Sequence, residues 1–411
     1  MPELFQVLTV AQANDLLAQH GVRLRRAEQV PVMDALDRVT AENLHAPVDL
    51  PAFSRSTMDG FAVRAADTYG ASEGLPAYLT VSGEVPMGRA AAIEIRAGEA
   101  ARIHTGGMLP AGGDAVVMVE NTQQLDERMI EVMQPVAVGE NVIPVGEDVR
   151  VGELLFAQGH WLRPQDLGGL AGVGITTVPV MARPRVAILA TGDEIVPADQ
   201  EVAPGQIRDI NSYTIAALTR RAGAEPVLYG IAPDRADTLR QMAGAALAES
   251  DLLIISAGSS VSTRDMTAQV IGDLGRPGVL VHGVSIHPGK PTILAVAGGK
   301  PVFGLPGNPV STMVAYELFV TPTILRMLGC ERTQAWRTVQ ARLTRNVASR
   351  AGREDFVPVR VETRADGMLW AEPVFGKSNL IYTMARADGM LAVPLDLAGL
   401  YAGDIVTVRL F

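Results

Sequence analysis

The sequence is poor in cysteine and lacks any long uncharged apolar segment. Cys330 is the only cysteine among 411 residues, which excludes an internal disulfide framework and any metal site built from several thiolates. No apolar run approaches the roughly 18–20 uncharged residues of a membrane-spanning helix, and residues 1–10 lack the basic start and apolar stretch of a secretory signal. We therefore expect a cytoplasmic protein with no membrane partner.

Positive charge is also scarce. The chain has 35 basic and 45 acidic residues, which give a formal net charge of −10, and its densest basic cluster, residues 23–28, is short. Because general binding to nucleic acid needs a basic surface, we expect no nucleic-acid partner. An acidic protein can still bind an anion locally, through backbone amides, a few cations or a metal ion.

Several common catalytic signatures are missing as well. Six scattered histidines form no evident Ser-His-Asp or Cys-His pattern, and the chain has neither a Walker A loop nor a G-x-G-x-x-G after the first strand of its α/β unit. These absences disfavour a P-loop kinase and a standard dinucleotide oxidoreductase.

The chain is rich in apolar residues, with 48% of its 411 residues hydrophobic, and this length is too great for one compact core. Its first fifty residues predict a helix after Thr9 and a second helix opened by Pro31 over residues 31–44. Short strands separated by glycine are predicted from about residue 60 to 145, and alternating strands follow Gly329. Several domains are therefore expected.

Strands that alternate with helices over residues 182–330 predict a right-handed doubly wound α/β domain. In an open parallel sheet, ligands bind at the carboxyl ends of the strands. Four such ends carry glycines, small hydroxyl residues and carboxylates, at residues 191–194, 233–235, 257–260 and 304–309. Because these ends converge at one edge of the sheet, we predict the functional site there.

Each motif alone has an ordinary structural alternative. Residues 304–309 could bind a phosphate at the start of the following helix or form a common strand-to-helix turn. Asp193 and Glu194 could ligate Mg²⁺ or form an acid pair in the first turn of a helix. Asp265 could reach a metal ion or lie solvated beside Arg264.

The same ambiguity holds for candidates elsewhere in the chain. Lys290 suits an anionic ligand but could be solvated, and His287 could be a structural imidazole or a ligand contact. Asp59, Thr105 and Asp148 lie in turns where an Asx-type role competes with substrate binding. The residues alone predict a Mg²⁺-assisted α/β protein that handles an anionic, phosphorylated small molecule.

Eight motifs in a fixed order resemble the molybdopterin molybdenumtransferase family, which includes MoeA and the E domain of gephyrin. The matching strings are STMDGFAV (56–63), HTGGMLPAGGDAVVM (104–118), GED (146–148), TGDE (191–194), DIN (209–211), SAGSSVSTRD (256–265), PGKP (288–291) and GLPGNP (304–309). They span nearly the whole chain, and their order is far more specific than any single motif.

The resemblance implies an elongated α/β multidomain fold. Its expected parts are a helical and extended N-terminal domain (1–52 plus 144–181), a β-rich inserted domain (53–143), a central doubly wound MogA-like α/β domain (182–330) and a small C-terminal β-barrel-like domain (331–411). It also implies a homodimer, with a site between the α/β domain of one subunit and the N-terminal domains of the other.

The reaction implied by the resemblance inserts molybdate into adenylylated molybdopterin, with Mg²⁺-dependent release of AMP. The substrate's own dithiolene binds the molybdenum, which is consistent with a chain that has one cysteine. A molybdopterin adenylyltransferase and the proteins that accept the finished cofactor are the implied partners.

The implied site residues fall into two groups. The catalytic acids are Glu194, Asp265, Asp59, Asp148 and Asp234, and the metal ligands are Asp193, Glu194 and Asp265. The substrate and phosphate contacts are Thr105, Thr191, Gly192, Gly258, Ser260, His287, Lys290, Pro306, Gly307, Asn308, Pro309 and Ser378.

The chain departs from the family pattern around the expected oxyanion region. The departures are Ala257, Ser259, Ser262, Gly283 and His287, the last of which stands where many members have lysine. They remove positive charge or glycine, and they motivate one alternative, a non-catalytic protein that binds pterin or oxyanion without turnover. A second alternative is a molybdopterin adenylyltransferase, because the α/β domain type is shared; the extra N- and C-terminal domains and the loss of basic character around 283–287 argue against it.

Overall fold

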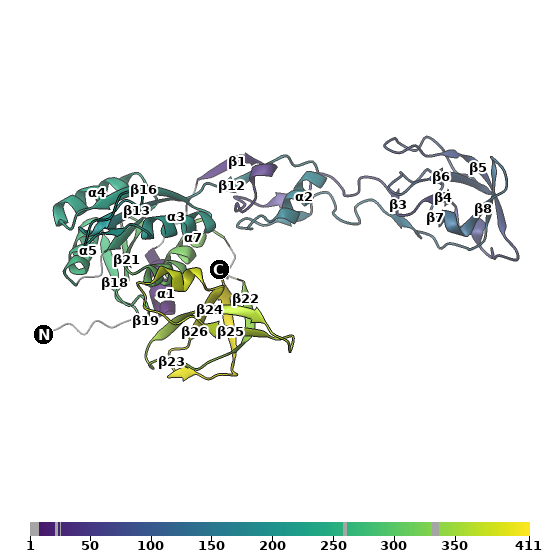
Figure 1. The fold of residues 1–411 in the computed structure, drawn as a ribbon. Coiled ribbons are helices and arrows are strands. Elements are labelled where there is room, and N and C mark those ends of the chain that lie inside the picture. Colours follow the sequence, from purple (N-terminus) through teal and green to yellow (C-terminus); the bar gives the residue numbers. More distant parts are fainter. Residues whose placement is uncertain (1–7, 21–23, 25, 258–260, 331–336) are drawn as a thin grey trace.

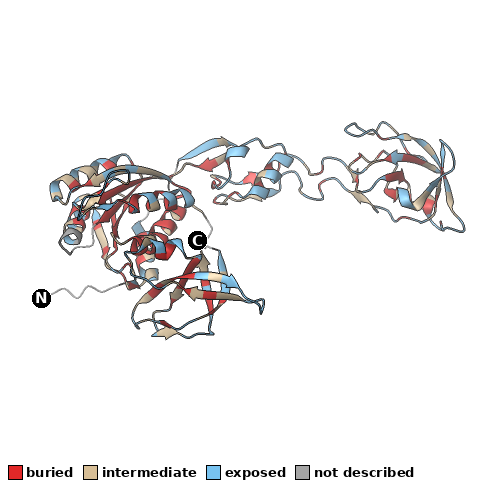
Figure 2. Ribbon diagram, in the orientation of Figure 1, coloured by how far each residue is buried: buried red, intermediate tan, exposed pale blue. Residues whose placement is uncertain are grey.

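The computed structural model is an elongated molecule with a two-domain body and a long arm (Figure 1). It describes residues 8–20, 24, 26–257, 261–330 and 337–411, with 261–264 described by their backbone alone. The body and both parts of the arm each have buried residues of their own (Figure 2). None of the described helices combines the length and the apolar character needed to cross a membrane.

The α/β domain of the body contains a six-stranded sheet of order β16-β13-β17-β21-β20-β18. The strands are β13 (Arg185–Thr191), β16 (Glu225–Ala232), β17 (Leu252–Ala257), β18 (Pro277–His282), β20 (Ile293–Ala297) and β21 (Lys300–Pro306). The first four in the sheet order are parallel. β17 is buried throughout, as expected for a parallel strand covered on both faces.

Helices cover both faces of this sheet and complete the predicted doubly wound fold. They are α3 (Asn211–Arg221), α4 (Ala236–Ala248), α5 (Val261–Asp273), α6 (Pro309–Ala315) and α7 (Thr321–Met327), the last two joined by a π-helical segment (Tyr316–Val320). Val186 and Ile188 of β13 pack with α3 and α6, whereas Ala187 and Leu189 pack with α4 and α5.

The far edge of the sheet differs from the open parallel sheet that the sequence predicts. β20 runs antiparallel to both β18 and β21. The connection from β20 to β21 is Gly298 and Gly299, both with positive φ. Two residues suffice for a hairpin, whereas parallel strands need a crossover of about a dozen residues.

The C-terminal domain is a small closed sheet, as its alternating pattern predicts. Its strands are β22 (Thr338–Leu343), β24 (Glu354–Thr363), β25 (Leu369–Pro373), β26 (Gly389–Val393) and β28 (Ile405–Leu410), with a short α8 (Ile381–Ala385) and a β23–β27 pair (Val347–Ala348 and Gly399–Leu400). β24 pairs with both β25 and β26, which closes the barrel. β19 (Ile286–His287) adds to its edge, so one ladder joins the two domains of the body.

The part of the arm next to the body is more extended than predicted. α1 (Val10–His20) forms as expected and packs against the α/β domain of the body, whereas residues 31–44 of the arm are not a helix. β1 (Ala27–Pro31) leads into a short 3₁₀ turn (Val32–Asp34), and Asp37 has a φ of 58° that ends any helical path. The backbone N–H of Asp37 donates to Leu162 O, and other amides of this segment pair with residues 160 and 179.

Tertiary pairing therefore overrides the local helical signal in the arm. The remaining elements of this part are β2 (Leu44–His45), β11 (Leu154–Phe156), α2 (Pro164–Gly172) and β12 (Thr177–Met181), which pairs with β1.

The distal part of the arm is a β domain with a six-stranded sheet of order β7-β4-β6-β5-β9-β8. Its strands are β4 (Gly60–Val63), β5 (Ala77–Glu84), β6 (Glu99–Ile103), β7 (Ala115–Met118), β8 (Thr122–Gln124) and β9 (Met129–Val132), with short 3₁₀ turns (Ala65–Thr68 and Val119–Asn121). A short pair of β3 (Arg55–Ser56) and β10 (Val142–Ile143) connects it to the rest of the arm. Figure 1 shows this domain far from the α/β sheet of the same chain.

Candidate functional site

The parallel strand ends meet at one edge of the sheet, as predicted. Thr191 ends β13, and its Oγ1 donates to Asp234 Oδ1 (3.0 Å) just beyond β16. The backbone N–H of Asp234 donates to Asp193 Oδ1 (3.0 Å). Gly192 lies between them with a φ of 154°, and a Cβ there would come within 2.8 Å of Glu194 Oε2. The two acidic loops are therefore held together by their own hydrogen bonds.

The ends of β17 and β21 meet around the first residue of α3. Asn211 Nδ2 donates to Ser256 Oγ (2.9 Å) and to Gly307 O (2.8 Å). A cavity of about 530 Å³, which we call the strand-end cavity, is lined by Asn211, Ser256, Gly307, Asn308, Pro309 and Asn379 among others. Pro306 O accepts a hydrogen bond from Thr312 Oγ1 and is buried behind this wall.

A second cavity lies between the α/β domain and the C-terminal domain. It encloses about 410 Å³, and we call it the charged cavity because His287, Arg353, Asp355 and Lys377 line it together with Ser378 and Thr383. Asn308 Nδ2 donates to Ser378 Oγ (3.0 Å), and the Val310 N–H donates to Ser378 O (3.1 Å). Asn308 and Ser378 therefore form a wall between the two cavities.

Asp355 is the centre of the charges in this cavity. Its side chain is 5% exposed, yet it carries Arg353 Nε at 2.9 Å and His287 Nδ1 at 3.2 Å from Oδ1. Ser349 Oγ donates to Oδ2 (2.7 Å). A buried carboxylate holds one guanidinium and one imidazole at the cavity wall, with each still partly exposed.

Two predicted residues meet in the distal domain instead. Thr105 donates to Asp59 Oδ1 from its backbone N–H (2.8 Å) and from Oγ1 (3.2 Å). These hydrogen bonds, aided by nearby His104, lower the pKa of the Asp59 carboxyl. Asp148 is exposed in the connection to the distal domain, where its N–H donates to Leu50 O.

Comparison with known proteins identifies the family. The family models "MoeA N-terminal region (domain I and II)", "Probable molybdopterin binding domain" and "MoeA C-terminal region (domain IV)" match residues 8–174, 187–326 and 340–411. The molybdopterin molybdenumtransferase of Bacillus subtilis is 34% identical over 95% of this chain and 91% of its own length. That of Nostoc sp. is 33% identical over 93% and 88%. The chain belongs to the molybdopterin molybdenumtransferase family.

Solved structures agree with this assignment. A molybdopterin biosynthesis MoeA protein from Pyrococcus horikoshii matches with a TM-score of 0.87 at 31% identity, covering 99% of this chain and 100% of that one. Another MoeA structure from the same organism matches at 0.82 and 37% identity, over 98% and 99%. The resemblance and fold class are confirmed, and this family member is a transferase that acts in molybdenum cofactor biosynthesis.

The remaining predicted site residues of this molybdenumtransferase family member have not been placed in either cavity. Gly258 and Ser260 lie outside the described residues, as does Ser259. Lys290 and Asp265 are exposed, and Lys290 does not line the cavities described above. Within the described residues, no group of three or more His, Cys, Asp or Glu could hold a metal ion. Mg²⁺ commonly needs only one or two protein carboxylates, because phosphate oxygens and water supply its other ligands.

The sequence did not predict Ser256, Arg353 or Asp355 as site residues. Asn211 belongs to a family-like motif, residues 209–211, but no role was predicted for it. Asn211 and Ser256 had a signal, because each lies within a string that resembles the family. Arg353 and Asp355 had none, since the β19–β24 ladder brings them to His287 from another domain.

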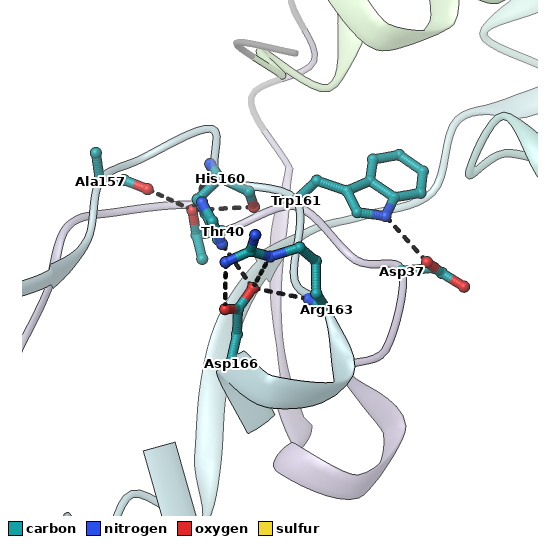
Figure 3. A network of polar contacts seen from close by, with 7 residues as sticks. All are labelled: Asp37, Thr40, Ala157, His160, Trp161, Arg163 and Asp166. Carbon is teal, nitrogen blue, oxygen red and sulfur yellow. Dashed lines mark hydrogen bonds and ion pairs between the residues drawn. The ribbon is translucent and has the colours of Figure 1, made fainter. Parts of the chain in front are cut away.

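A further polar network of this family member lies at the start of α2 in the arm (Figure 3). Arg163 donates to Asp166 from Nε, Nη2 and its backbone N–H, and His160 Nε2 lies 2.8 Å from Asp166 Oδ2. Burial would raise the pKa of Asp166, but the hydrogen bonds from Arg163 and His160 outweigh it and lower that pKa to about 2. Both carboxylate oxygens are paired, so we assign this network a structural role.

Proposed function

We propose that this protein inserts molybdate into adenylylated molybdopterin and releases AMP in a Mg²⁺-dependent reaction. The observation that carries the proposal is a pair of cavities, one lined by Asn308 and the other by Ser378, whose side chains are joined by a hydrogen bond. One cavity offers small residues, amides and hydroxyls, and the other offers a guanidinium, an imidazole and an ammonium group. A reaction between a nucleotide-linked heterocycle and a separate oxyanion matches this division.

In this proposal the strand-end cavity binds the nucleotide-linked pterin. Gly307, Asn308 and Pro309 precede or begin α6, and the positive end of its helix dipole favours a phosphate. The charged cavity holds molybdate, with His287, Arg353 and Ser378 as donors. Lys290 would add long-range positive charge at the surface.

Asp193 and Glu194 would hold Mg²⁺, with Asp265 as a further acid. Mg²⁺ supplies positive charge at the phosphoryl oxygens where the anhydride breaks. Thr191 and Gly192 fix the acidic loop through the contact with Asp234, and these residues orient the substrate phosphates.

We also propose a homodimer in which Asp59, Thr105 and Asp148 complete the site of the partner subunit. This is supported by the large separation between the distal domain and the α/β sheet of the same chain (Figure 1). The substrate would come from a molybdopterin adenylyltransferase, the product would pass to cofactor-accepting proteins, and the reaction would take place in the cytoplasm.

The decisive experiment mixes purified protein with adenylylated molybdopterin, molybdate and Mg²⁺ and follows AMP. Release of AMP that depends on molybdate and Mg²⁺ is expected, and its absence with every divalent cation tried would remove the proposal. ATP consumption with free molybdopterin would indicate an adenylyltransferase instead.

Glu194→Gln and Asp265→Asn separate catalysis from binding alone. In a transferase these variants lose AMP release and keep most of their affinity for the pterin. If the wild type binds pterin and releases no AMP, the non-catalytic alternative holds; the change at His287 is the feature that favours it.

A further inference from the structure

Asn211 is a buried amide whose orientation is fixed by its neighbours. Its residue is 7% exposed, at the first position of α3 and in the wall of the strand-end cavity. Gly307 O is a backbone carbonyl and can only accept a hydrogen bond, so the atom 2.8 Å away must be the nitrogen of Asn211. The amide oxygen is therefore the atom left for another partner.

That oxygen has no hydrogen-bond partner among the described residues. Buried polar groups are normally satisfied, because an unpaired buried acceptor destabilises the fold. Asn211 itself lies where the ends of β17 and β21 and the start of α3 meet around the cavity.

We propose that Asn211 Oδ1 accepts a hydrogen bond from an N–H of the bound amino-heterocycle and so positions it in the strand-end cavity. This inference rests on the proposed function, because that function supplies such a ligand. Both ring systems of adenylylated molybdopterin carry an N–H donor: adenine has its amino group, and the pterin has an amino group and ring N–H groups. Asn211 is a positioning residue that selects a donor on the ring edge.

Ligand pairs that differ in this donor test the inference by calorimetry on the full chain. The first pair is AMP and purine riboside monophosphate, which has a hydrogen atom in place of the amino group and gains no new N–H. The second pair is a 6-substituted pterin and its analogue with a methylated ring nitrogen and a dimethylated amino group. For one pair we expect the wild type to prefer the donor-bearing ligand by about tenfold, and that pair identifies the ring.

The variant Asn211→Leu should bind both members of the pair equally, because it keeps the volume and loses the acceptor. Ser256→Ala is the matched control. It removes one hydrogen bond of the same amide and leaves Oδ1 in place, so it should keep the preference even where affinity falls. A structural role alone would lower affinity for both members and leave the ratio unchanged.

Two outcomes overturn the inference: a wild type that prefers neither donor-bearing ligand, or Asn211→Leu retaining the wild-type ratio. The first needs no variant, so the test survives if Asn211→Leu fails to fold. AMP release without any donor preference would contradict the inference and leave the proposed function intact. A clear preference for the donor-bearing ligand without AMP release would support the inference and contradict the proposed function.

Discussion

Helices α2 and α3 both begin with a buried polar side chain, and they differ in how completely it is paired. Asp166 in the first turn of α2 receives four hydrogen bonds from Arg163 and His160. Asn211 at the start of α3 has a paired nitrogen, whereas its oxygen has no partner in the part of the chain that the structure describes. A closed network stabilises the fold, whereas an incomplete one beside a cavity is typical of a ligand site. Each region predicts a different response to mutation.

The largest expected effect is on stability, at the closed network. Asp166→Ala leaves Arg163 and His160 without their shared acceptor, and we expect a loss of about 3 kcal/mol in the free energy of unfolding. Urea denaturation measures it. Asp237→Ala is the control, since this acid also lies in the first turn of a helix but its side chain is 94% exposed; it should change stability by less than about 0.5 kcal/mol. AMP release per folded Asp166→Ala molecule should match the wild type, and a selective loss of activity would contradict the structural assignment.

The next effect is the pH dependence of the same carboxylate. Its folded-state pKa of about 2 lies below the ordinary value of 3.8, so its charged form stabilises the native state above about pH 4. That contribution, about 2 kcal/mol, is lost as pH falls from about 4 to 2. The stability difference between wild type and Asp166→Asn should shrink over this window. A constant difference from pH 2 to 5 would refute the depressed pKa.

A third test moves to the charged cavity, where Asp355 holds Arg353 but leaves it about one-third exposed. Arg353→Gln removes a charge-assisted donor, and we expect molybdate affinity to fall by about tenfold or more while AMP affinity stays unchanged. Arg345→Gln is the matched control, because Arg345 pairs with Glu372 on the same domain outside the cavity. Equal losses in both variants would mean that only the net charge matters.

The sequence predicted the α/β edge well for a physical reason. Parallel strands read as buried apolar runs, and their carboxyl ends must fall on one side of the sheet, so Thr191 and Asp234 could be placed together in advance. The helix predicted over residues 31–44 was wrong, because backbone pairing with distant residues outweighs a weak local preference for helix.

Contacts between domains could not be predicted from the sequence. The His287–Asp355 contact depends on β19 pairing with β24, and the two strands come from separate domains. No local pattern encodes the partner of an edge strand, because any exposed strand edge offers the same backbone groups. The unpaired oxygen of Asn211 has the same origin, since its neighbours Ser256 and Gly307 follow other strands.

The smallest expected effect is at His287, where an imidazole occupies a position that is often lysine in the family. His287→Lys places a permanent charge beside Asp355 at the mouth of the charged cavity. Because the side chain is 60% exposed, solvent screens the added charge, and we expect only about a threefold gain in molybdate affinity at low salt. The gain should fade as salt shortens the range of the charge. A loss of affinity would instead show that the imidazole contacts the oxyanion with a geometry that the ammonium group cannot reproduce. The charged cavity would then recognise its ligand through the position of a single polar group, as proposed for Asn211, and not through its net charge.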